Sequence, residues 1–93
     1  MRHSKRNIYY HELIGLGVEV LEYPDPSIAG LSGRVVDETM KTLLIESPGR
    51  GFVRVLKEHG VFRFKTPYGL SFTVIGTRIV GRPEDRLKRI VRR

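Results

Sequence analysis

The sequence predicts a small, mainly β domain, a strongly bent antiparallel barrel of about six strands with a short helix at each end. The chain has 93 residues, which suits one domain near the lower limit for folding on a single core. Between residues 17 and 81, short segments of alternating apolar and polar residues are separated by turn sequences. Such alternation buries one face of a sheet, and closing short strands into a barrel removes exposed edges. We expect three parts in this one domain: a basic segment with a helix at 1–16, the barrel at 17–81, and a basic helical tail at 82–93.

The N-terminal part predicts a short helix. Asn7 is a candidate N-cap and Gly15 a candidate stop, and the apolar and aromatic residues between them recur at helical spacing. A helix this short requires packing against the rest of the domain.

The predicted strands follow one another with single turns between them. They lie at 18–23, 31–37, 41–46, 51–57, 61–65 and 70–75, with a brief strand at 78–80. Gly33 indicates a bulge or tight bend inside the second strand. Three aromatic residues are interpreted as core: Phe52, Phe62 and Phe64. The alternation in the last long strand places three residues on one buried face: Leu70, Phe72 and Val74.

The tail has the signals of a helix start. Pro83 suits the first helical position, and Glu84 and Asp85 follow where the helix dipole favours negative charge. An apolar stripe follows with the i, i+3, i+4 spacing, and basic residues occupy the C-terminal end.

Charge is distributed unevenly along the chain. Residues 17–49 hold six acids against two cations, a balance of −4, whereas residues 50–93 hold twelve cations against three acids, a balance of +9. Self-repulsion of this kind does not stabilise a fold, so the basic half predicts a polyanionic partner.

The composition excludes several function classes. The chain has no Cys, which rules out disulfides, thiol catalysis and a cysteine zinc site. His11 and Glu12 lack the second His of a zinc protease motif, and no catalytic constellation, metal site or bound cofactor is predicted. Asp37 and Glu38 have the oxygen chemistry that Mg²⁺ takes beside an RNA phosphate, but acids in turns are usually solvated. No segment resembles a signal peptide or membrane span, so we expect a cytoplasmic protein that does not contact membranes.

The basic residues indicate RNA as the polyanion. Cations on consecutive predicted strands lack acidic neighbours in their own half of the chain, and Arg, which grips phosphate with a planar fork, outnumbers Lys there. Structured RNA offers phosphates and 2′-OH groups to such a surface without base readout. The predicted RNA-contacting residues are Arg34, Lys41, Arg50, Arg54, Lys57, Arg63, Lys65, Arg78, Arg82, Arg86, Lys88 and Arg89.

Three segments together are similar to one known family. They are ELIGL at 12–16, GRVVDET at 33–39 followed by Thr42 and Leu43, and RPEDR at 82–86. In this order and spacing they resemble the archaeal ribonuclease P protein component 1 family, over nearly the whole chain.

The resemblance implies an Sm-like, or SH3-like, barrel that serves as a protein subunit of ribonuclease P, the ribonucleoprotein endonuclease that removes the 5′ leader of precursor tRNA. It implies ribonuclease P RNA, precursor tRNA and a zinc-ribbon protein subunit as partners, with the chemistry supplied by the RNA and its Mg²⁺. It also implies that the N-terminal helical segment contacts the protein partner, through Ile8, Tyr9, Leu13 and Ile14.

Two other functions stay open from the residues alone. A general Sm-like RNA-binding module would form a homo-oligomer by strand addition, whereas the isolated ribonuclease P subunit is expected to be a monomer. A small-barrel protein adaptor would direct the basic face to an acidic protein.

Overall fold

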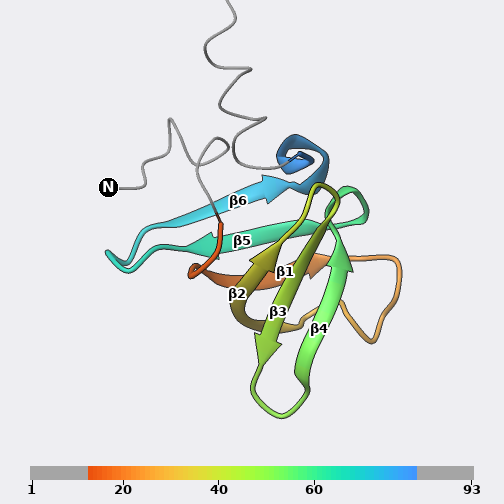
Figure 1. Ribbon diagram of the computed structural model, residues 1–93, viewed down its shortest axis with the longest axis horizontal. Helices are drawn as coiled ribbons and strands as arrows, with labels where there is room; N and C mark the ends of the chain where they lie inside the picture. The colour runs from red at the N-terminus through yellow and green to blue at the C-terminus, as the bar shows by residue number, and fades with distance from the viewer. Residues whose placement is uncertain (1–12, 82–93) are drawn as a thin grey trace, which may run out of the picture.

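Six antiparallel strands form one sheet in the computed structural model, which describes residues 13–81. The strand order is β4-β3-β2-β1-β5-β6. The strands are β1 (Gly17–Glu22), β2 (Ser32–Glu38), β3 (Thr42–Ser47), β4 (Gly51–Leu56), β5 (Val61–Lys65) and β6 (Ser71–Ile75). The sheet bends strongly, so β5 and β6 run crosswise to β3 and β4 (Figure 1). The predicted mainly β fold of six strongly bent antiparallel strands is confirmed, but among residues 13–81 no strand pairing joins β4 to β6, so the barrel is open along these two edges.

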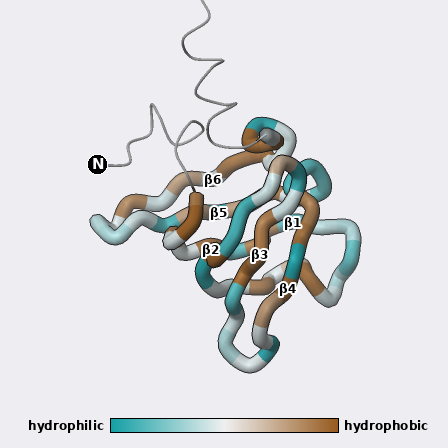
Figure 2. The backbone as a smooth tube through the Cα atoms, viewed as in Figure 1, coloured by the Kyte–Doolittle hydropathy of each residue, from teal (hydrophilic) through white to brown (hydrophobic). Residues whose placement is uncertain are grey.

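The core lies inside the bend and receives residues from every strand. Alternate positions of each strand point inward, and Val20, Val35, Ile45, Phe62 and Phe64 are all fully buried. Hydrophobic and hydrophilic residues therefore alternate along the strands, while several connecting loops are hydrophilic (Figure 2). Burial of two Phe and many branched side chains supplies most of the stabilisation of this small domain.

The second strand bends where β2 leaves β1 and pairs with β3. Its first half pairs with β1, and its second half pairs with β3 across an extra residue between Val35 and Asp37. The predicted bulge is thus present, but it lies after Gly33 rather than at it. A Cβ at Gly33 would lie 2.1 Å from the carbonyl oxygen of Glu46, so the glycine permits the close approach of β2 to β3.

Two 3₁₀ turns complete the barrel, η1 (Lys57–His59) and η2 (Gly76–Ile79). The second turn replaces the brief strand predicted at 78–80. The amide N–H of Gly76 donates to the carbonyl of Gly60 at 2.8 Å, and this contact turns the chain so that Ile79 is fully buried.

Two apolar residues predicted as core are exposed. Phe52 is 66% exposed and Leu70 is 51% exposed. On β4 the inward positions belong to Val53 and Val55, which places Phe52 on the outer face. Leu70 precedes β6 and lies outside its alternation. The two predicted terminal helices fall mostly or wholly outside the described residues.

Candidate nucleic-acid interface

One row of residues on the outer face crosses all six strands. Each strand register pairs one member with the next, and paired residues of an antiparallel ladder point to the same face. From β4 to β6 the row reads Phe52, Glu46, Arg34, Gly17, Lys65 and Ser71. Every member except Gly17, which is half-buried, is exposed.

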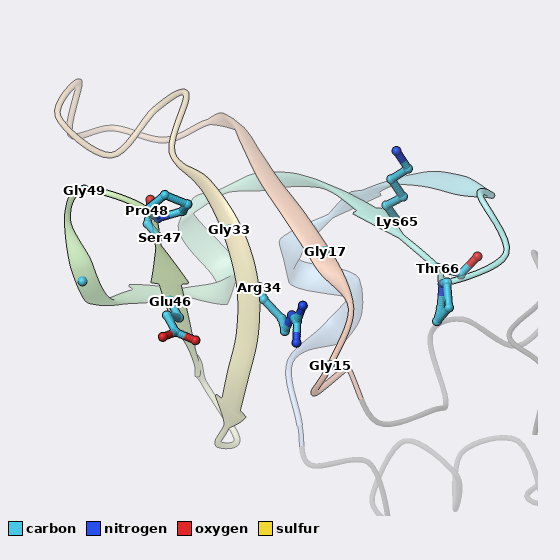
Figure 3. A pocket seen from close by; sticks show the side chains of 12 residues that line it. Gly15, Gly17, Gly33, Arg34, Glu46, Ser47, Pro48, Gly49, Lys65 and Thr66 are labelled. Carbon is cyan, nitrogen blue, oxygen red and sulfur yellow. The ribbon is translucent and has the colours of Figure 1, made fainter.

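An open groove of about 810 Å³ lies over the middle of this row. Gly17 lies between Arg34 on one side and Lys65 on the other, and Glu46 lies beyond Arg34 (Figure 3). The groove therefore has two cations on its walls and a position without a side chain between them.

Two hydroxyl groups at the rim of the groove form hydrogen bonds with the protein backbone and hold the rim in place. Ser47 Oγ donates to the carbonyl of Ser32 at 2.7 Å and joins the end of β3 to the start of β2. Thr66 Oγ1 accepts from the backbone N–H groups of Tyr68 and Leu70, each at 3.3 Å, and shapes the turn between β5 and β6. Both residues are buried, so the edges of the groove are held by the protein.

Three of the predicted RNA-contacting arginines are engaged with protein oxygens. Arg63 forms an ion pair with Glu19 at 3.3 Å, with both side chains about half exposed. Arg54 donates to Thr42 Oγ1 at 2.9 Å, and Arg50 donates to the carbonyl of Ser27. The acid that pairs with Arg63 comes from the acidic half of the chain. The scarcity of acids in the basic half is therefore a poor guide to which cations are free of protein partners.

Arg34 and Lys65 differ from these arginines. Both are exposed, and among residues 13–81 neither side chain has an ion-pair or hydrogen-bond partner. Lys41, between β2 and β3, and Arg78, in η2, are also exposed. The remaining predicted RNA-contacting residues, Arg82, Arg86, Lys88 and Arg89, lie outside the described residues.

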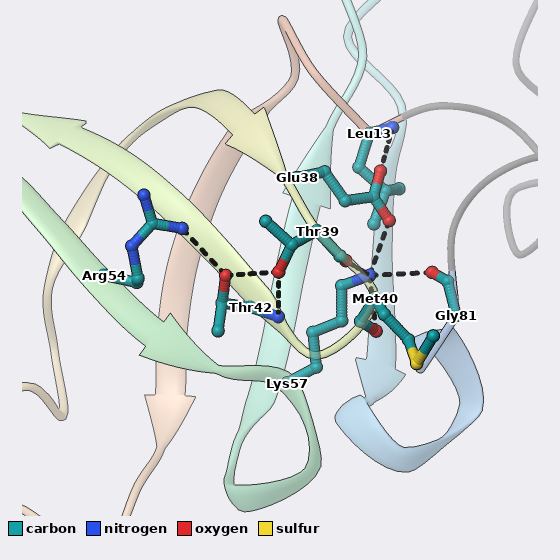
Figure 4. A network of polar contacts seen from close by, with 8 residues as sticks. All are labelled: Leu13, Glu38, Thr39, Met40, Thr42, Arg54, Lys57 and Gly81. Carbon is teal, nitrogen blue, oxygen red and sulfur yellow. Dashed lines mark hydrogen bonds and ion pairs between the residues drawn. The ribbon is translucent and has the colours of Figure 1, made fainter.

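Lys57 is removed from the RNA-contacting set, because its side chain is fully buried. Its ammonium nitrogen lies 2.7 Å from Glu38 Oε2, 2.7 Å from the carbonyl oxygen of Thr39 and 2.9 Å from that of Gly81 (Figure 4). An ammonium group has three donors, and these three oxygens satisfy them. No phosphate can reach this nitrogen while the barrel is folded.

Glu38 is likewise not the solvated turn acid that the sequence predicts. It ends β2, its side chain is fully buried, and its second oxygen accepts the backbone N–H of Leu13 at 3.2 Å. A carboxylate committed to Lys57 is not available to Mg²⁺, whereas its neighbour Asp37 is exposed. The buried pair thus joins the chain entering the barrel at Leu13 to the chain leaving it at Gly81 (Figure 4).

The predicted protein-partner residues are divided by the structure. Leu13 is fully buried in the barrel core, so it is not an accessible contact residue. Ile14 is 42% exposed. Ile8 and Tyr9 lie outside the described residues.

Sequence reasoning missed Phe52 as a candidate functional residue. A phenylalanine with two-thirds of its surface exposed offers a flat apolar face at one end of the row that contains Arg34 and Lys65. The available signal was the pair Val53 and Val55, since two β-branched residues at alternate positions define the inner face and place Phe52 outside.

Two further observations concern the described residues alone. No group of three His, Asp or Glu side chains is placed to hold a metal ion within residues 13–81. No helix in this part of the chain is long and apolar enough to span a membrane.

The pKa of Asp25 is lowered from its ordinary value of 3.8. The main cause is the backbone N–H of Ser27, which donates to the carboxylate; the Ser27 hydroxyl contributes next, and Arg50 adds a smaller effect.

Comparisons with known proteins agree on one family. The model of the family described as ribonuclease P/MRP, subunit p29, matches residues 6–89. A protein named ribonuclease P protein component 1 from Staphylothermus marinus is 59% identical over 92 residues, covering 99% of this chain and 100% of that protein. One with the same name from Desulfurococcus amylolyticus is 53% identical, with the same coverage. The solved structure of Mth11, described as a homologue of the human RNase P protein Rpp29, is 46% identical with a TM-score of 0.61, covering 82% of this chain and 97% of that one.

Proposed function

Because this chain belongs to the ribonuclease P/MRP subunit p29 family, we propose that it is an RNA-binding subunit of ribonuclease P and supports 5′ maturation of precursor tRNA. The observation that carries the proposal is the 59% identity, over 99% of this chain and 100% of its relative, to a protein named ribonuclease P protein component 1. Mth11, described as a homologue of the human RNase P protein Rpp29, shares the fold.

The proposed mechanism is electrostatic. Exposed cations on the outer face neutralise phosphates of a folded region of the RNA subunit, which relieves repulsion between its strands. The RNA then holds its active form at lower Mg²⁺. Neutralising about five phosphates gives a slope of log affinity against log salt of roughly −3.5 to −4.5.

In this proposal the chain supplies no catalytic group. The RNA subunit and its Mg²⁺ cleave the precursor tRNA, and the protein acts in the cytoplasm together with a zinc-ribbon protein subunit. The isolated chain is a monomer. The exposure of Ile14, next to the buried Leu13, supports a protein contact where the chain enters the barrel.

Reconstitution tests the proposed function. The chain is mixed with ribonuclease P RNA and the zinc-ribbon subunit, and precursor-tRNA cleavage is measured against Mg²⁺. We expect half-maximal cleavage at lower Mg²⁺ with the chain than without it. Equal Mg²⁺ dependence, or a salt slope of RNA binding near zero, rejects the proposal.

A further inference from the structure

Gly17 is a glycine that the fold does not require. Its φ is not in the left-handed region, and a Cβ built there meets nothing nearer than Lys65 Cβ at 3.5 Å, an ordinary van der Waals contact. Gly33, which also lines the groove, allows no Cβ, and Gly15 has a φ of 95°. Gly17 is the first residue of β1 and pairs with both β2 and β5, and a residue with a side chain would lose less conformational entropy on folding at this extended position. The glycine keeps the floor of the groove open.

The open floor separates two cations whose side chains have no ion-pair or hydrogen-bond partner among residues 13–81. Arg34 and Lys65 both pair with Gly17 across the ladder, so their Cα atoms are about 10 Å apart, twice the strand spacing. Arg34 and Lys65 lie on either side of the strand that carries Gly17 (Figure 3), and exposed side chains of this length can rotate to reach one anion held above Gly17. Glu46 lies on the far side of Arg34 and repels an anion there, which favours the Gly17 side.

The same row offers an aromatic surface. Phe52 pairs with Glu46, three strands from Gly17, and is 66% exposed. Measured along the sheet, its Cα is therefore about 14 Å from that of Gly17, three strand spacings, which an extended sugar–phosphate chain can cover. Bases stack on exposed aromatic rings only when they are unpaired.

From these observations we propose that an unpaired RNA strand lies along this row, across the strands of the barrel. A phosphate occupies the notch above Gly17, between Arg34 and Lys65, and a base stacks on Phe52. The groove volume of about 810 Å³ is within the range of pockets that hold small ligands, and its rim is fixed by Ser47 and Thr66. This inference rests on the proposed function and specifies it, since it selects single-stranded over duplex RNA at this surface.

The test is fluorescence anisotropy on the full chain, with a labelled 15-nucleotide oligouridylate and a 15-base-pair RNA duplex. The wild-type chain is expected to bind the single strand more tightly. Arg34→Gln with Lys65→Gln is expected to weaken single-strand binding at least 10-fold and to reduce the salt slope by about 0.7, the value for one single-strand phosphate contact. The matched control, Lys41→Gln with Arg78→Gln, removes the same charge from exposed residues outside the row and is expected to lose no more than 3-fold.

Two uncharged changes test the geometry. Gly17→Ala and Gly17→Val fill the notch without altering charge, and single-strand affinity is expected to fall progressively, at least 5-fold for Val. Phe52→Ala is expected to weaken binding of the single strand at least 5-fold while leaving duplex binding unchanged, and Phe52→Trp to restore it. Circular dichroism and thermal melting confirm folding, and Gly17→Ala carries the steric test if Gly17→Val does not fold.

The outcomes separate the inference from the proposed function. Any of three results rejects the proposed phosphate site above Gly17. These are tighter binding of the duplex than of the single strand, equal losses of affinity in the two double variants, and full affinity in folded Gly17→Ala and Gly17→Val. If the wild-type chain still lowers the Mg²⁺ requirement of reconstituted ribonuclease P in that case, the proposed function stands. A wild-type chain that binds neither RNA overturns both.

Discussion

Lys57 lies four residues before β5 and Lys65 is the last residue of β5, yet their environments are opposite. Lys57, before β5, is fully buried and holds Glu38 and two or more carbonyl oxygens. Lys65, at the end of β5, is exposed, and among residues 13–81 it has no ion-pair partner. Sequence assigns both the same charge and the same predicted role. Burial and partner oxygens therefore decide whether a cation stabilises the fold or is available to a ligand.

The largest expected effect is the loss of the buried ion pair. Lys57→Ala leaves Glu38 and nearby carbonyl oxygens buried without their donor, so the free energy of unfolding is expected to fall by about 3–5 kcal/mol. Glu38→Met with Lys57→Met removes both charges and is expected to cost less than the single change. Chemical denaturation measures both. A loss below about 1 kcal/mol for Lys57→Ala would show that the ammonium is not confined as described.

Two glycines that line the groove, Gly33 and Gly17, differ in whether the fold has room for a side chain. Gly33→Ala places a Cβ against the Glu46 carbonyl and is expected to destabilise the fold by about 2 kcal/mol or more. Gly17→Ala is expected to leave stability unchanged or raise it by up to about 1 kcal/mol, because it reduces the entropy of the unfolded chain. Thermal denaturation of both variants is the measurement. Equal destabilisation contradicts the claim that only one of the two is required by the fold.

The exposed cations of the groove are expected to contribute little to stability. Lys65→Ala and Arg34→Ala should each change the free energy of unfolding by no more than about 0.5 kcal/mol, since neither has a protein partner among the described residues. Urea unfolding checks this. A cost near that of Lys57→Ala would remove the distinction between the two kinds of cation.

The exposed pair Arg63–Glu19 lies between these extremes. Its N···O distance is 3.3 Å with both side chains about half exposed, so a double-mutant cycle is expected to give a coupling of about 0.2–1 kcal/mol. The coupling should decrease as salt is added. Coupling that is insensitive to salt would indicate a buried pair instead.

The smallest expected effect concerns Asp25, in the loop between β1 and β2. Its lowered pKa means that its contribution to stability is present above pH 3.8 and is lost as the pH falls through the lower folded value. Ser27→Ala removes the hydroxyl donor but keeps the backbone N–H, so the pKa of Asp25 should rise only part of the way to 3.8. An NMR titration of the carboxyl group measures it, and a wild-type value of 3.8 or above contradicts the described contacts.

Much of the fold was predictable because local patterns determine it. Period-two alternation and turn residues located the six strands to within one or two residues, and Phe62 and Phe64 were predicted as core. The prediction failed where tertiary contacts decide. The bulge lies after Gly33 because of how β2 passes β3, and η2 replaces a strand because Gly76 pairs with Gly60.

Less of the site was predictable, because it depends on strand register. The row from Phe52 to Ser71 unites residues spread over 55 positions of the chain, and only the pairing of all six strands aligns them. Register also pairs Arg63 with Glu19 from the acidic half of the chain. To predict the burial of Lys57, one would need to know that Glu38 and Gly81 both lie next to its ammonium group. No spacing in the sequence indicates this.

We propose that Arg34 and Lys65 bind RNA, whereas Lys57 stabilises the fold. The most direct measurement is the Mg²⁺ dependence of precursor-tRNA cleavage by ribonuclease P reconstituted with the Arg34→Gln, Lys65→Gln double variant. We predict that half-maximal cleavage shifts to higher Mg²⁺ while the thermal stability of the free variant matches that of the wild type. An unchanged Mg²⁺ dependence with a normally folded variant would contradict the claim.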